Sequence, residues 1–157
     1  MTAADYADQI RNDLRDHWLP HIYTERILKL RTRAYHFDKL NPRGQIAVQH
    51  TLLGVELKAG RQRFLCPDLP TARYLSVFAR IGCHDVAIPY DITKISRLAD
   101  ELESSWYRML LLADYRAANE TERSRNRIRR LLINEVLEEL KTAGAGPEVP
   151  EFKQSTR

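Results

Sequence analysis

The sequence predicts a single α+β domain, with an N-terminal helix, a basic antiparallel strand-rich centre and a helical C-terminal half. Three observations lead to this fold class. Apolar residues recur at helical spacing at both ends of the chain, its centre alternates like strands, and 157 residues with 43% hydrophobic content suffice for one core. We therefore expect residues 1–143 to form one globular domain and residues 144–157, which are poor in apolar side chains, to be a mobile tail.

The N-terminal helix is predicted from Ala3 to Leu19. Its apolar stripe repeats every four residues and consists of Tyr6, Ile10, Leu14 and Trp18. Proline has no backbone N–H and its ring clashes with the preceding helical turn. Pro20 is therefore expected to end this helix.

Residues 22–37 admit two readings. As a strand, apolar residues alternate with Lys29, Arg31 and Arg33, which then share one face. As a helix, the apolar residues fall at spacings of three and four, and Lys29 and Arg33 again lie together. We favour the strand, and both readings predict a basic surface.

The most strand-like part of the chain is the segment 45–67. Ala59–Gly60 is typical of a turn between two strands, so we expect a hairpin near residues 55–66. Gly54 interrupts the apolar pattern and is expected to mark a β-bulge.

Three helices and one short strand are predicted after the hairpin. The helices are expected at about residues 70–81, 92–118 and 122–143, and the strand at 85–89. Gly82 is a C-terminal stop, Asp91 or Thr93 is a cap, and the last two helices are expected to form an antiparallel hairpin. The run Leu110–Leu112 cannot face one core in full, so we expect the final helix or a second subunit to cover part of it.

Composition also limits the cellular setting. No run of about 18 apolar residues is present and the N-terminus is polar and acidic, so we expect a cytoplasmic protein without membrane contact. Cys66 and Cys83 are far apart, which favours buried free thiols over a disulfide.

The chain carries no glycine-rich phosphate loop and no nucleophile elbow, so we expect no cofactor. His17 and His21 have the spacing of two zinc ligands on a helix. Pro20 interrupts the helix between them, and no cysteine or acid stands nearby at ligand spacing. We therefore expect no metal.

Charge is distributed unevenly. Residues 21–63 carry nine basic against three acidic side chains, whereas residues 85–122 carry four against eight. A second dense run lies at residues 123–130, where Arg123, Arg127 and Arg130 would share one helical face. Arginine contacts phosphate with a planar fork, so these runs favour an anionic partner.

Glu56 and Lys58 form an acid-x-Lys triplet after apolar residues, which resembles the catalytic strand of the PD-(D/E)xK nucleases. That resemblance implies a divalent metal held by Glu56 and an upstream acid, for which Asp38 is the candidate, with Lys58 orienting the attacking water. The triplet occurs three times in this chain, so by itself it is a weak signal.

We expect a non-enzymatic, nucleic-acid-associated accessory protein with a basic, arginine-rich surface. Its predicted contact residues are Lys29, Arg31, Arg33, Arg61, Arg63, Arg123, Arg127 and Arg130. One alternative is an assembly or adaptor protein that binds a protein partner or another copy of itself through its C-terminal helices. A second alternative is the metal-dependent nuclease with Asp38, Glu56 and Lys58 as catalytic residues.

Overall fold

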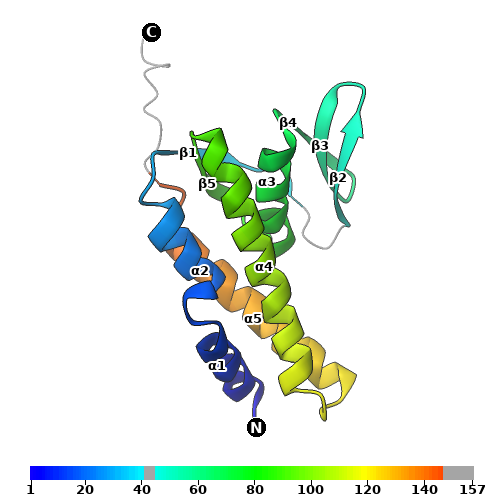
Figure 1. Ribbon diagram of the computed structural model, residues 1–157. Coiled ribbons are helices and arrows are strands. Elements are labelled where there is room, and N and C mark those ends of the chain that lie inside the picture. Colours follow the sequence, from blue (N-terminus) through cyan, green and yellow to red (C-terminus); the bar gives the residue numbers. More distant parts are fainter. Residues whose placement is uncertain (41–44, 147–157) are drawn as a thin grey trace.

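The computed structural model describes residues 1–40 and 45–146 (Figure 1). An N-terminal helix, two small antiparallel sheets in the middle and two long C-terminal helices confirm the predicted α+β class. The helical segments are α1 (Ala3–Leu14), the 3-10 turn η1 (Arg15–His17), α2 (Leu19–Ile22), the π-turn η2 (Tyr23–Ile27), α3 (Leu69–Ile81), α4 (Ile92–Arg116) and α5 (Glu122–Ala143). The strands are β1 (Thr32–His36), β2 (Ile46–Thr51), β3 (Gly54–Ala59), β4 (Gln62–Cys66) and β5 (Asp85–Pro89).

The N-terminal helix is shorter than its apolar stripe predicts. Thr2 and Asp5 form a reciprocal capping box at its start, but α1 ends at Leu14 because Arg15 adopts a positive φ of 50°. Pro20 does not end this helix. It lies in the first turn of α2, where its missing N–H leaves no hydrogen bond unmade.

Each of the two readings of residues 22–37 describes one part of the segment. The chain stays helical through η2 to Ile27, and β1 begins only at Thr32. The favoured strand is therefore wrong for the first half of the segment. Tyr23 and Ile27 are both buried at a spacing of four, so burial of the helical face decides the structure there.

Two tyrosines bind the free edge of β5. Because β1 and β5 pair with Ala34 opposite Ala87, the N–H and C=O of Ala87 point away from β1. The Tyr23 hydroxyl accepts from the Ala87 N–H (3.0 Å) and donates to the Gly144 carbonyl (2.6 Å), while the Tyr74 hydroxyl donates to the Ala87 carbonyl (2.5 Å). Burial raises the pKa of Tyr23 to about 12, so it remains a donor.

The second sheet has the order β2-β3-β4 and contains the predicted hairpin, with Gly60 in the β3–β4 turn. Strands β2 and β3 pair residue by residue, from Ile46 opposite Ala59 to Thr51 opposite Gly54. No residue is skipped in this register, so the bulge expected at Gly54 is absent. Gly54 instead ends a turn at a φ of 128°, which suits glycine. This turn carries Leu52 and Leu53 into solvent, 106% and 80% exposed.

Helices α3, α4 and α5 form as their apolar stripes predict. Gly82 closes α3 in the left-handed region, and Asp91 caps α4 by accepting from the Thr93 N–H. Helix α3 packs against both sheets and along α4, so one buried cluster joins the two sheets and all the long helices (Figure 1).

Both cysteines are buried and free, as predicted, and burial raises the pKa of the Cys83 thiol to about 11. Over residues 1–40 and 45–146, no helix is long and apolar enough to span a bilayer. From residue 147 onward, the predicted tail lies outside the described residues.

Candidate nucleic-acid interface

The acidic side chains of α4 are engaged by other parts of the chain. Arg73 of α3 binds Asp100 (2.5 Å) and Glu103 (2.6 Å). Arg26 of η2 binds Glu101, and Arg129 of α5 binds Asp114. All four carboxylates of this helix thus have a cationic partner within the protein.

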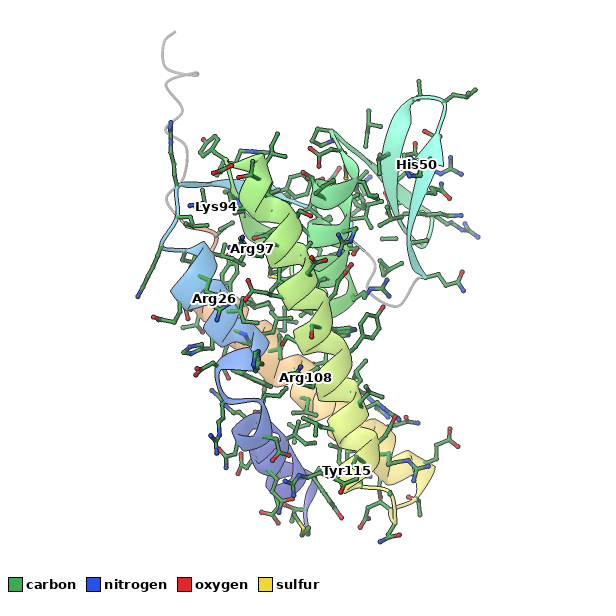
Figure 2. All side chains as sticks on the ribbon, in the orientation of Figure 1. Arg26, His50, Lys94, Arg97, Arg108 and Tyr115 are labelled. Carbon is green, nitrogen blue, oxygen red and sulfur yellow. The ribbon has the colours of Figure 1, made fainter. Side chains whose placement is uncertain are left out.

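Three of the four basic side chains of α4 are arranged in the opposite way, and only the fourth, Arg116, binds a carboxylate of the described residues, that of Asp13 (2.6 Å). Lys94, Arg97 and Arg108 are exposed and have no carboxylate within 4.0 Å among the described residues. Figure 2 shows these three side chains along one side of α4. A segment with a net negative sequence charge therefore presents unpaired positive charge to solvent.

A second chain segment meets α4 at its N-terminal end. The Tyr90 N–H donates to the Arg31 carbonyl (3.1 Å), which extends the β1–β5 pairing by one residue, and the Arg31 guanidinium lies 4.9 Å from the centre of the Tyr90 ring. A cavity of about 360 Å³ is lined by Leu30, Arg31, Pro89, Tyr90, Asp91 and Lys94. We call Arg31, Tyr90, Lys94 and Arg97 the Tyr90 cluster.

The only carboxylate that lines this cavity is that of Asp91, and it is hydrogen-bonded to the first turn of α4, which it caps. Asp91 accepts hydrogen bonds from the N–H (3.0 Å) and the hydroxyl (2.7 Å) of Thr93, and these bonds hold its pKa below the ordinary value. Asp91 does not pair with Arg31 or Lys94. The Tyr90 cluster therefore combines a guanidinium fork, an ammonium and an exposed aromatic ring, which are groups that bind phosphate and stack on bases.

The other basic residues that were predicted to contact nucleic acid in the centre of the chain differ in burial, in ion pairing and in the element that carries them. Lys29 is exposed but pairs with Glu25 (2.9 Å), and Arg33 is half-buried on β1. Arg61 lies in the β3–β4 turn and Arg63 on the outer face of β4, 4.0 Å from Glu56.

The arginine run of the last helix lies elsewhere. Arg123, Arg127 and Arg130 are exposed near the start of α5, at the end of the molecule opposite β1 (Figure 1). Arg127 also lines a cavity of about 250 Å³ together with residues of the N-terminus. The structure therefore separates these three residues, the α5 arginine face, from the Tyr90 cluster.

The acid-x-Lys residues lie on one sheet. Glu56 and Lys58 project from the same face of β3, where Glu56 accepts from the Gln49 amide (3.4 Å) and Lys58 is opposite Arg63. Asp38 follows β1, which belongs to the other sheet. Within residues 1–40 and 45–146, no three His, Cys, Asp or Glu side chains are grouped as a metal site would require.

Sequence reasoning did not single out Tyr90, Lys94 and Arg97. Lys94 and Arg97 alternate with the buried Ile95 and Leu98, so the helical periodicity of α4 contained a signal for their exposure. Comparison with known proteins adds no family: no family model, no curated protein and no solved structure matches this chain.

Proposed function

We propose that this protein binds nucleic acid through the Tyr90 cluster and acts as an accessory protein without catalysing a reaction. One observation carries the proposal. Cations from two distant segments, Arg31 just before β1 and Lys94 of α4, line one cavity with the exposed ring of Tyr90, and neither is paired with a carboxylate of the described residues.

A basic side chain binds phosphate more readily when it is not already in an ion pair with a carboxylate of the protein. A guanidinium already bound to a carboxylate must give up that contact first, as Arg73 or Arg26 would. Arg31, Lys94 and Arg97 need no such exchange, because none of them has a carboxylate within 4.0 Å among the described residues. Counterion release from phosphates then favours binding at low salt.

The direct test is fluorescence anisotropy with labelled single-stranded and duplex oligonucleotides of mixed sequence, over a series of salt concentrations. The variant Arg31→Ala/Lys94→Ala/Arg97→Ala should weaken binding to every sequence. It should also flatten the slope of log K against log salt by about 0.7–0.9 for each lost phosphate contact.

The chain offers a matched control with the same loss of three charges. Arg123→Ala/Arg127→Ala/Arg130→Ala removes the α5 arginine face and should leave most of the affinity and slope in place. Equal losses in both triple variants would refute the Tyr90 cluster as the binding site. Binding that does not depend on salt would refute phosphate contact altogether.

An assembly or adaptor protein is the second candidate function. It is favoured by the exposed apolar residues in the C-terminal half of α4, which are Tyr107, Leu111 and Tyr115. Apolar contacts resist salt, whereas phosphate contacts do not, so the same salt series distinguishes the two functions.

A further inference from the structure

Strand β1 has a free edge on the side that faces away from β5. The Phe37 N–H donates to the His84 carbonyl (2.8 Å), so in this antiparallel pair every second residue before Phe37 also bonds to β5. The residues between them are Thr32, Ala34 and His36, and their N–H and C=O groups point away from β5. None of these backbone groups has a hydrogen-bond partner among the described residues.

The two edges of this sheet therefore differ. On β5, the hydroxyls of Tyr23 and Tyr74 bind the outward N–H and C=O of Ala87. On β1, no side chain of the described residues plays this part, and none of the outward residues is a proline, which would lack the donor. The β1 edge thus offers a complete set of donors and acceptors to a further strand.

A buried hydroxyl on β1 also lacks a partner. Thr32 is only 9% exposed, and its Oγ1 makes no hydrogen bond within residues 1–40 and 45–146. Directly opposite residues of paired strands have their Cβ atoms about 4.5–5.5 Å apart. A strand added to this edge would therefore bring side chains next to the Thr32 hydroxyl.

The side chains of an added strand would alternate between the two faces of the sheet. On one face, the small and exposed Ala34 lines a cavity of about 550 Å³ together with residues of β5 and of the C-terminal end of α5. This cavity has room for a side chain of the added strand. On the other face, the half-buried Arg33 and Tyr35 would lie beside it.

The charge around this edge determines which strand fits. Arg31, just before β1, and Arg33 project to the same face, and Lys39 follows the strand. None of the three has a carboxylate within 4.0 Å among the described residues, and Asp38 is the one acid between residues 30 and 40. An acidic strand is attracted to this surface, whereas a second copy of this chain would bring the same arginines to it.

We propose that the β1 edge binds an extended, acidic peptide segment of a partner protein as a third strand of the β1–β5 sheet. In this mode, main-chain hydrogen bonds to Thr32, Ala34 and His36 supply affinity, and the alternate side chains of the peptide supply specificity. Acidic side chains of the peptide lie on the face of Arg33, and apolar ones lie over Ala34.

Amide hydrogen exchange in the full chain tests whether the edge is open. In the free protein, the N–H groups of Ala34 and His36 should exchange fast, while those of Arg33 and Tyr35, which are bonded to β5, should be protected. If Ala34 and His36 are protected at every protein concentration, the chain covers its own edge. If their protection rises with concentration, a second copy covers it. Either result overturns the proposal.

The binding probe is an acetylated octapeptide of alternating glutamate and valine, added to the full chain and followed by NMR. It should shift the amide resonances of Ala34 and His36 in a saturable way and slow their exchange. The same peptide with lysine in place of glutamate should bind at least about tenfold more weakly. No binding of the glutamate peptide at millimolar concentration overturns the proposal.

Two methylated forms of the peptide, equal in composition and charge, test the hydrogen bonds themselves. Valines that lie over Ala34 are directly opposite the outward residues of β1, so their N–H groups are the ones that bond to it. Methylation of the valine nitrogens should therefore abolish binding, while methylation of the glutamate nitrogens, which face away, should leave it nearly unchanged. Equal binding of both forms contradicts pairing at the strand edge.

A variant of the protein completes the test. Ala34→Pro removes the central outward N–H without removing a bond to β5, so it should abolish peptide binding, whereas Ala34→Ser keeps the N–H and should bind like the wild type. Circular dichroism checks that both variants fold. Arg33→Glu tests the same site through charge, in case the proline is not tolerated, and should weaken binding by at least about tenfold.

These results are distinguishable from a failure of the proposed nucleic-acid site. Ala34→Pro leaves Arg31, Lys94 and Arg97 in place, so its affinity for oligonucleotides should equal that of the wild type. A folded Ala34→Pro protein that binds the glutamate peptide as well as the wild type does overturns the proposal.

Discussion

The cations of the Tyr90 cluster and of the α5 arginine face all lack a carboxylate partner within residues 1–40 and 45–146, but the two basic regions arise in different ways. The α5 arginine face comes from one run of sequence on one helix, and its charges lie side by side because of helical spacing alone. The Tyr90 cluster joins the start of β1 to the start of α4 through the β1–β5 pairing, and it includes an aromatic ring. A site assembled from distant segments can surround a ligand, whereas a single helical face can only touch one side of it.

The comparison also shows that the charge of a segment is a poor guide to the charge of its surface. Residues 85–122 have four more acids than bases, yet the acids of α4 point to Arg26, Arg73 and Arg129, while Lys94 and Arg97 face solvent. Only the charged side chains that have no ion-pair partner within the protein are available to bind another molecule.

The largest expected difference between the two regions comes from charge reversal. Arg31→Glu should weaken oligonucleotide binding by about tenfold or more at low salt, because it removes a charged hydrogen bond and offers Lys94 an internal partner. Arg127→Glu makes the same change in the α5 arginine face and should alter the affinity by less than about threefold. Anisotropy at one fixed salt concentration measures both, and a reversed order would place the binding site on α5.

A smaller effect is expected from the ring of Tyr90. Tyr90→Ala should lower the affinity for single-stranded oligonucleotides by about fivefold to tenfold, since it removes a stacking surface and the support of the Arg31 guanidinium. Tyr90→Phe keeps the ring and should bind like the wild type. If the phenylalanine variant is as weak as the alanine variant, the hydroxyl and not the ring is responsible.

The smallest effect concerns stability and separates paired from unpaired arginines. Arg73→Ala removes contacts to two carboxylates of α4 and should lower the free energy of unfolding by about 0.5–1 kcal/mol. Arg97→Ala breaks no ion pair in the described part of the chain and should stay within about 0.5 kcal/mol of the wild type. Urea titrations followed by circular dichroism measure both, and a clear loss in Arg97→Ala would mean that this residue has a structural role.

Local signals in the sequence predict much of the fold. The stripes of α3, α4 and α5, the glycine stop at Gly82 and the cap at Asp91 depend on neighbours within a few residues, and each forms as predicted. The positive φ of Arg15 has no such signal, because the residue is neither glycine nor asparagine. The turn at Leu52 and Leu53 does carry a signal in Gly54, but a glycine within an apolar run is also typical of a β-bulge, which was the structure expected there.

The candidate site was only partly predictable for a related reason. Arg31 was identified from its basic segment, and the exposure of Lys94 and Arg97 follows from the period of α4. Their meeting beside Tyr90 depends on β1 pairing with β5, and nothing within either strand specifies its partner.

The hydrogen bonds that Tyr23 and Tyr74 make to Ala87 have a consequence for solubility. A sheet of two strands has two open edges, and an open edge can recruit a strand from another molecule and start aggregation. At the middle of β5 the tyrosine hydroxyls occupy both backbone groups that an incoming strand would need. The protein thus protects the β5 edge of its smaller sheet with side chains, where larger sheets use further strands.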